Sequence, residues 1–212
     1  RGRYLLAAPE SRKTGEADAG ILKLMGEAQM PEVVERYLRA VEANNPVGAL
    51  IAYPGSPLLI AQAMRPQDRL AACELQTDEA DAVKELFAHD SRVAVHARDG
   101  YTAIKAMLPP RTETLKFARG LVLIDPPYEV QDNEYPQIIS TVRDALERWP
   151  QATYAIWYPI KLRRSLQPFF RKAAALPGKS VMLAELQIRP DDSPLRLNGS
   201  GLVIVNPPWK FD

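Results

Sequence analysis

Residues 121–128 read Leu121-Val122-Leu123-Ile124-Asp125-Pro126-Pro127-Tyr128, an uninterrupted apolar run that stops at an acidic residue and two prolines. Four consecutive apolar residues before a turn are typical of a strand that is covered on both faces. A second run of this kind, Leu202–Val205, stops at Asn206-Pro207-Pro208-Trp209. We therefore predict an α/β fold with a mostly parallel sheet and helices on both of its faces.

Short apolar runs alternate with amphipathic stretches through much of the remaining chain. The other predicted strands are Leu70–Leu75, Val93–Ala97, Thr153–Trp157 and Val181–Ile188. Helices are predicted from Ser56 as N-cap with Pro57 in the first turn, from Thr77, from Asp99-Gly100 to Met107, over Tyr135–Leu146, and over Lys161–Ala174 with a bend or restart at Pro168. Residues of about 15–46 have helical spacing without a strand, and we interpret them as a helical insertion packed on the sheet.

The length of 212 residues, 46% of them hydrophobic, is enough to bury the core of a single domain. We interpret residues 1–212 as one domain that is incomplete at both ends, because its first strand and the sequence after Trp209 are nearly missing. Cys73 is the single cysteine, so no internal disulfide is expected, which fits a reducing cytoplasm. We interpret Cys73 as a small core residue. No run of about 18 apolar residues occurs, and no membrane span is expected.

The loop Asp125–Tyr128 follows a predicted strand at the edge where open parallel sheets bind ligands. An aromatic amine such as adenine N6 is a poor nucleophile because its lone pair is delocalised into the ring, so its methylation needs acceptors for both N–H groups. Asp125 supplies a carboxylate and Pro126 a rigid backbone carbonyl, while the ring of Tyr128 can stack on a base drawn out of its helix. This is the pattern of amino-methyltransferases; a stiff turn that Asp125 caps is the alternative.

The segment Asn206–Trp209 fits the same four-residue pattern, and chain order separates the two loops. A methyltransferase sheet needs further strands after its catalytic loop. Three predicted strands follow Tyr128, whereas only three residues follow Trp209. We therefore assign Asp125–Tyr128 as the active loop, and Asn206–Trp209 as a structural turn or as a wall of the base pocket.

Three positions are candidates for binding the methyl donor, S-adenosylmethionine. Glu74 ends a predicted strand before a helix, where an acidic residue accepts hydrogen bonds from ribose hydroxyls, although a surface glutamate is an equal alternative. Asp99 can accept from the adenine amine while Gly100 allows a close backbone approach, and Asp99 can also cap the helix. Gly2 is interpreted as the last glycine of the glycine-rich loop expected after the first strand.

Together these motifs resemble the bacterial 23S ribosomal RNA adenine-N6 methyltransferase family, ribosomal RNA large subunit methyltransferase J. The segments that carry the likeness, in chain order, are Tyr53-Pro54-Gly55-Ser56-Pro57, Glu74-Leu75, Asp99-Gly100, Asp125–Tyr128, Trp157-Tyr158-Pro159 and Asn206–Lys210. The resemblance implies a Rossmann-like methyltransferase fold with a small helical insertion. It also implies that Ser56, Glu74 and Asp99-Gly100 bind S-adenosylmethionine, and that Asp125 is the catalytic acceptor. Only Gly2 remains here of the family's Asp-x-His-Ala-Gly-x-Gly loop.

Charge and metal-ligating residues limit the partners. The formal net charge is +1, so a surface that binds nucleic acid must be a local patch. The densest basic cluster is either a solvated helix face or a contact to RNA phosphates, and it consists of Lys161, Arg163, Arg164, Arg171 and Lys172. His89 and His96 have no metal-like spacing with Cys73, so no metal site is expected.

By resemblance, the substrate is adenine N6 in 23S ribosomal RNA, protein-free or early in assembly, and the enzyme is a cytoplasmic monomer. DNA adenine-N6 or ribosomal RNA guanine-N2 methylation is an alternative, because Asp-Pro-Pro-Tyr serves all of them. A non-catalytic RNA-binding protein with a degenerate methyltransferase domain is another, against which the intact loop Asp125–Tyr128 argues. Cofactor binding by the complete protein separates these classes.

Overall fold

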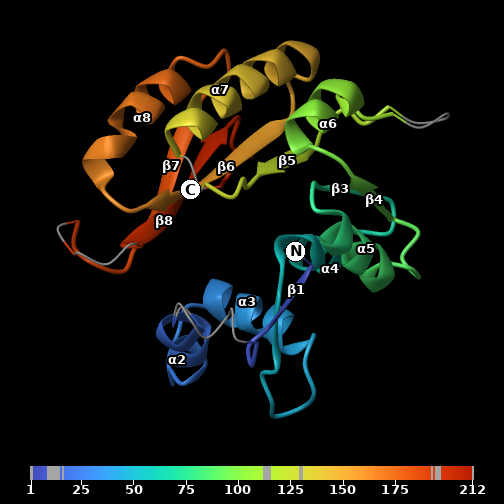
Figure 1. The fold of residues 1–212 in the computed structure, drawn as a ribbon, viewed down its shortest axis with the longest axis vertical. Helices are drawn as coiled ribbons and strands as arrows, with labels where there is room; N and C mark the ends of the chain where they lie inside the picture. The colour runs from blue at the N-terminus through green and yellow to red at the C-terminus, as the bar shows by residue number, and fades with distance from the viewer. Residues whose placement is uncertain are drawn as a thin grey trace. The chain divides into compact units, whose positions relative to one another are not determined.

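The computed structural model of the protein describes residues 2–8, 15, 17–111, 116–128, 131–191, 193 and 197–211. The chain divides into two compact units, Arg1–Asp99 and Gly100–Asp212, and each has hydrophobic clusters of its own (Figure 1). The first unit carries four of the predicted cofactor-binding residues, Gly2, Ser56, Glu74 and its last residue, Asp99. The second begins at Gly100 and carries the predicted active loop.

The first unit begins with a strand pair that brackets a helical segment. Strand β1 (Arg3–Leu5) pairs antiparallel with β2 (Ala52–Pro54). Between them lie the π-helical turn η1 (Asp18–Leu22), the short α2 (Lys23–Met25) and α3 (Glu32–Glu42). These helices occupy the region where the sequence predicts a helical insertion, and they bury Ile21, Leu38 and Val41 in a small core.

The rest of the first unit is a parallel two-stranded βαβ arrangement. Its elements are α4 (Ser56–Ala63), β3 (Leu70–Glu74), α5 (Thr77–Leu86) and β4 (Val93–Ala97). Strands β3 and β4 run parallel with Leu70 opposite Val93, and both residues pack on Val83 of α5 and its neighbours. Cys73 is exposed, so its prediction as a core residue is wrong: alternation along β3 turns it away from the face that holds Leu70.

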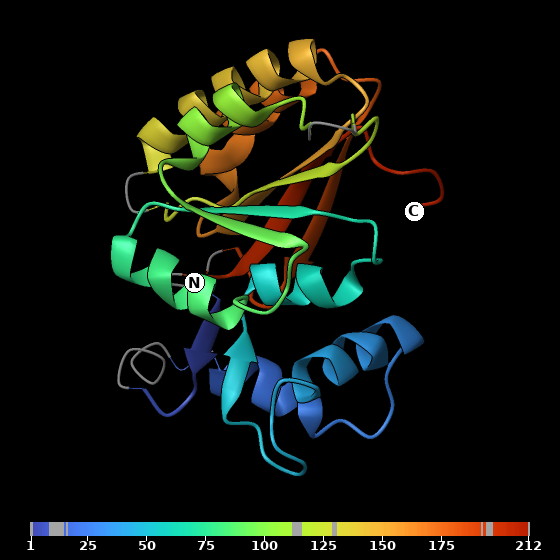
Figure 2. The same ribbon diagram turned by 90° about the vertical axis from the view of Figure 1, so that its right-hand side faces the viewer.

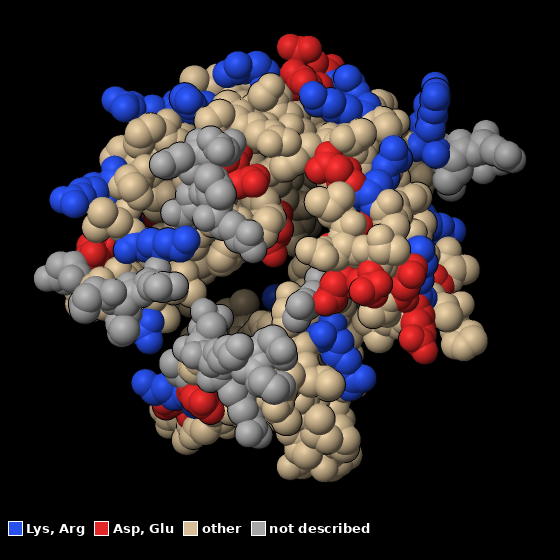
Figure 3. All heavy atoms as spheres, in the orientation of Figure 1, with Lys and Arg blue, Asp and Glu red and all other residues tan. Residues whose placement is uncertain are grey.

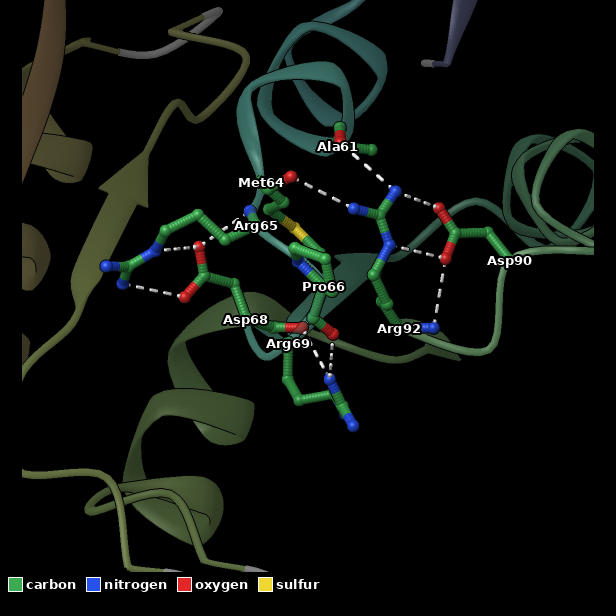
Figure 4. Close-up of polar contacts among 8 residues, drawn as sticks. All are labelled: Ala61, Met64, Arg65, Pro66, Asp68, Arg69, Asp90 and Arg92. Carbon is green, nitrogen blue, oxygen red and sulfur yellow. Dashed lines mark hydrogen bonds and ion pairs between the residues drawn. The ribbon is translucent and has the colours of Figure 1, made fainter.

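Arg92 links the end of α4 to the start of β4 (Figure 4). Its guanidinium donates to the carbonyls of Ala61 at 3.3 Å and Met64 at 3.0 Å, which belong to the last turn of α4. Asp90 holds the same guanidinium with an Nη2–Oδ2 distance of 2.6 Å. Carbonyls at a helix end have no partner within the helix, so Arg92 supplies one from the neighbouring strand.

We expect the Arg92 contacts to make the stability of the first unit depend on acid. Hydrogen bonds from Arg92 lower the pKa of Asp90 to about 2, from about 4 in an unfolded chain. A lowered folded-state pKa stabilises the protein above pH 4, and this contribution is lost as the pH falls towards 2. Arg92→Ala should therefore lower the melting temperature more at pH 5 than near pH 2, where only the contacts of Arg92 to the α4 carbonyls are still lost. A deficit that stays constant between these pH values would contradict the assignment.

The second unit is built on a four-stranded sheet in the order β5-β6-β8-β7. Its strands are β5 (Leu121–Ile124), β6 (Thr153–Ile160), β7 (Val181–Gln187) and β8 (Gly199–Val205). Strands β5 and β6 are parallel, and β8 is antiparallel to both of its neighbours, so β5, β6 and β7 point the same way. The prediction of a mostly parallel sheet is thus not confirmed, because β7 and β8 form a hairpin and β8 returns between β6 and β7.

Helices α6 (Gly100–Met107), α7 (Gln131–Arg148) and α8 (Gln167–Ala174) lie over one face of this sheet (Figures 1 and 2). The short 3-10 turn η2 (Arg163–Leu166) precedes α8, whose first turn contains Pro168, so the predicted restart at this proline is confirmed. The largest buried side chains of β6, such as Tyr154 and Tyr158, belong to the core that α7 and α8 cover. The prediction that β5 is covered on both faces is wrong, since Leu121 and Leu123 stay exposed.

Candidate active site

The loop Asp125–Tyr128 leaves β5 at the carboxyl edge of the sheet, beside the carboxyl half of β6. The register places Ile124 opposite Ile156, so the loop begins next to Trp157. The side chain of Asp125 is exposed, yet surrounding protein atoms desolvate its carboxyl in part and raise its pKa. A carboxylate with a raised pKa is a better hydrogen-bond acceptor for an amine.

Tyr128 anchors this loop to β6. Its backbone is left-handed, with a φ of 51°, and its side chain is only 3% exposed. The hydroxyl donates to the carbonyl of Trp157, and the ring lies 5.5 Å from that of Tyr135 and 5.8 Å from that of Trp157, measured between centroids. Burial also raises the pKa of the hydroxyl, which stays protonated as a donor. Stacking of Tyr128 on a base stays a prediction, and it requires the ring to leave this position.

The loop Asn206–Trp209 lies at the opposite edge of the same sheet. Because β8 runs antiparallel to β6, its carboxyl end meets the amino end of β6, with Val205 opposite Tyr154. This position excludes Asn206–Trp209 as a wall of a pocket around Asp125 and leaves the structural alternative. The reversal of β8 places the two loops at opposite edges of the sheet, and the assignment of Asp125–Tyr128 as the active loop stays a prediction.

Asn206 joins the end of β8 to two neighbouring segments at this edge. Its amide nitrogen donates to the carbonyls of Pro150 at 3.0 Å and Ala152 at 2.9 Å, and its amide oxygen accepts from the backbone N–H of Lys179 at 2.8 Å. Its own carbonyl accepts from the hydroxyl of Thr153 at 2.7 Å. The backbone has a φ of 55°, a conformation that asparagine tolerates better than most residues.

We expect Asn206→Ala to destabilise the second unit by about 3 kcal/mol, because the carbonyls of Pro150 and Ala152 lose their donor and alanine is strained at positive φ. Asn206→Gly removes the same amide without that strain and should cost about 1 kcal/mol less. Urea denaturation of both variants measures the two contributions. Equal stability of the alanine variant and the wild type would show that the amide contributes nothing.

Two of the predicted cofactor residues lie at the carboxyl edge of β3 and β4. Glu74 is the last residue of β3, is paired in register with Ala97, and accepts the backbone N–H of Gln76 through Oε1 at 3.0 Å. Asp99 lies two residues after β4 and directly before the first residue of α6, the position of a helix cap. Parallel pairing brings both carboxylates to the same edge, as the sequence argument requires.

Ser56 and Gly2 lie close together in the same unit, around Gly55. Ser56 is exposed and is the first residue of α4, whose N-cap is Gly55, so the prediction of Ser56 as N-cap is wrong. The backbone N–H of Gly55 donates to the carbonyl of Gly2 at 2.9 Å. Gly2 is buried, and a Cβ there would come within 2.9 Å of a methyl of Leu86 and 3.2 Å of one of Val83. Its glycine therefore permits close packing, and cofactor contacts of Gly2 and Ser56 stay predictions.

The predicted basic cluster is divided by an ion pair. Arg163 Nη2 lies 2.6 Å from Glu185 Oε2, and the other oxygen of Glu185 accepts from the hydroxyl of Tyr158 at 2.8 Å. This pairing neutralises Arg163. In the described part of the second unit, no carboxylate forms an ion pair with Arg164 or with the two cations of α8, and Figure 3 shows basic side chains along the outer side of α8.

Two contacts of the site had only weak signals in the sequence. The carbonyl of Trp157 that holds Tyr128 is a backbone group, which no residue pattern marks. A hydrogen bond between Tyr101 and Glu134 joins residues 33 positions apart, and only the place of Tyr101 directly after Asp99-Gly100 pointed to it. Among the described residues, no cluster of three metal-ligating side chains occurs and no helix is long and apolar enough to cross a membrane.

A sheet with one reversed strand, and an Asp-Pro-Pro-Tyr loop at the end of a parallel strand, defines the class of methyltransferases that act on amino groups. The family model described as "Ribosomal RNA large subunit methyltransferase D, RlmJ" matches residues 1–212. The chain belongs to this family.

Related proteins agree with the family assignment. Two relatives named "Ribosomal RNA large subunit methyltransferase J" match the whole chain and 73% of their own length: the one from Haemophilus influenzae is 37% identical over 212 residues, and the one from Escherichia coli is 34% identical over 211. A crystal structure of a Legionella pneumophila protein, 30% identical, superposes with a TM-score of 0.82 over 100% of this chain and 75% of that one.

Proposed function

We propose that this protein transfers the methyl group of S-adenosylmethionine to N6 of an adenine in 23S ribosomal RNA, on a Rossmann-like methyltransferase fold. The observation that carries the proposal is the loop Asp125–Tyr128, anchored at the carboxyl end of β5 with an exposed carboxylate of raised pKa. The names of the relatives support ribosomal RNA of the large subunit as the substrate.

The residues at the carboxyl edge of β3 and β4 have the chemistry that the methyl donor needs. S-adenosylmethionine carries a ribose and an adenine amine, both hydrogen-bond donors, and supplies an electrophilic methyl group on a sulfonium. Glu74 and Asp99 are acceptors at the same edge, and one carboxylate oxygen of Glu74 is committed to Gln76. We assign ribose binding to Glu74, adenine binding to Asp99-Gly100, and supporting contacts to Ser56 and Gly2.

Asp125 and the carbonyl of Pro126 accept the two N–H groups of the target amine. These hydrogen bonds localise the lone pair on nitrogen and point it at the methyl group. As the N–C bond forms, the S–C bond of the sulfonium breaks to leave a neutral thioether, and the positive nitrogen then releases a proton to water. The interaction with Asp125 grows as this positive charge develops, so Asp125 stabilises the transition state more than the bound substrate. The left-handed turn at Tyr128 and its bond to Trp157 fix the loop that carries both acceptors.

We further propose that the enzyme is a cytoplasmic monomer. Its RNA substrate is protein-free or early in assembly, because an adenine must leave its stack to reach Asp125. DNA adenine-N6 and ribosomal RNA guanine-N2 transfer use the same loop chemistry, and they are tested as competing substrates. A non-catalytic RNA-binding protein would bind RNA and transfer no methyl group.

The first test is single-turnover methylation of protein-free 23S RNA fragments by variants of the loop. Asp125→Ala should lower the rate about 100- to 1,000-fold with little change in cofactor affinity. Asp125→Asn keeps an acceptor oxygen, so its rate should fall between those of the wild type and Asp125→Ala. The wild-type rate should decline as the pH falls through the pKa of Asp125, whereas the asparagine variant should not follow that titration.

Variants outside the carboxylate complete the same experiment. Tyr128→Phe keeps the ring and removes the anchor: a wild-type rate supports stacking alone, and a lowered rate supports anchoring. Asn206→Gly should keep its activity where it is folded, as judged by melting. An inactive Asn206→Gly with an active Asp125→Ala would overturn the assignment of the active loop, and exclusive methylation of DNA would overturn the substrate.

The basic cluster gives a separate prediction for RNA binding. If Arg164 and Arg171 contact phosphates, replacing both with Ala should reduce the slope of log K against log salt by roughly 0.7 per contact. Arg163→Ala should change the slope less, because Glu185 already neutralises this cation. Equal slopes for all three proteins would leave the cluster as a solvated helix face.

A further inference from the structure

The first turns of α6 and α7 are joined by one hydrogen bond. The hydroxyl of Tyr101 donates to Oε2 of Glu134 at 2.7 Å, and both side chains are half-buried. Tyr101 is the second residue of α6 and directly follows Asp99-Gly100 in sequence. Glu134 belongs to the first turn of α7, six residues after Tyr128. Tyr101 therefore follows the loop that the proposed function assigns to the cofactor, and Glu134 follows the loop that it assigns to the target base.

The surroundings of this bond keep it in place. The ring of Tyr101, like that of Tyr135, packs against the core that contains Tyr128. A carboxylate in the first turn of α7 is favoured by the partial positive charge of a helix N-terminus. Both Tyr101 and Glu134 lie close enough to Tyr128 to help raise the pKa of its hydroxyl, after the larger effect of burial.

The other ends of the same two helices are tied by different contacts. Lys105 Nζ lies 3.8 Å from Asp144 Oδ2 in an exposed ion pair, and Arg148 donates to the carbonyl of Lys105. These contacts hold α6 beside α7 without touching either loop. The chain thus offers a matched pair of inter-helix ties, one at the loops and one remote from them.

We propose that the Tyr101–Glu134 hydrogen bond is a positioning contact for methyl transfer. It fixes the start of α6, which follows the cofactor-side loop, against the start of α7, which follows the base-side loop. Transfer requires the amine nitrogen, the methyl carbon and the sulfur to be in line, and a shift of about 1 Å can cost roughly 100-fold in rate. Neither residue touches the reacting atoms. The inference rests on the proposed function.

A double-mutant cycle on the complete protein tests this role. Tyr101→Phe keeps the ring and removes the donor, and Glu134→Ala removes the acceptor. Each should lower the single-turnover rate on the order of 10-fold at saturating cofactor and RNA, within the range that misplacement produces. Their combination should be no slower than either alone, because both remove the same bond. Glu134→Gln keeps an acceptor oxygen and should restore most of the rate.

Three measurements separate positioning from stability. Asp144→Ala removes the ion pair with Lys105 at the remote ends of the helices and should leave the rate unchanged. Calorimetric titration should give Tyr101→Phe the cofactor affinity of the wild type, and thermal melting should show it folded at the assay temperature. The inference would be overturned by any of three results for the single-turnover rate. The rate losses of the two single variants could multiply in the double variant, Asp144→Ala could lose as much rate as they do, or both single variants could keep the wild-type rate. An inactive wild type would instead overturn the proposed function, and this inference with it.

Discussion

The parallel pairing of β5 with β6 is the constraint on which the carboxyl edge of the second unit's sheet depends. The pairing runs from Leu121 opposite Thr153 to Ile124 opposite Ile156. It brings the loop after β5 to the backbone of Trp157, where the hydroxyl of Tyr128 finds its acceptor. A slip of one residue would turn Ile124 out of the core and Tyr128 away from β6, so the hydrophobic core and the loop geometry require the same register.

The reversed strand β8 gives two similar sequences different roles. Asp125–Tyr128 and Asn206–Trp209 both follow apolar strands, but antiparallel pairing carries the second loop to the far edge of the sheet. There the amide of Asn206 satisfies backbone groups from two neighbouring segments. At the carboxyl edge of β5 the side chain of Asp125 remains exposed. The direction of the preceding strand thus decides whether the polar side chain of this motif meets the protein's own backbone or stays exposed.

Close packing also determines which member of the basic cluster is neutralised. The ring of Tyr158 lies across Gly201, where any Cβ would overlap it, and this position brings its hydroxyl to Glu185. A carboxylate with little exposure needs a cation, and Arg163 provides it from the turn after β6. The basic cluster therefore loses one member to the internal structure of the sheet. Its remaining cations lie on η2, on α8 and at Lys161.

The sequence by itself determined the local features of this protein. Apolar runs ended by turn residues placed Val93–Ala97 and Leu121–Ile124 at the observed bounds, and Asp-Pro-Pro-Tyr after a strand indicated the chemistry of the loop. Only the tertiary structure decided that Cys73 is exposed, that Tyr128 is buried and that β8 is reversed. The physical reason is range: turn and periodicity signals act between near neighbours, whereas exposure and strand direction depend on partners that are distant in the chain.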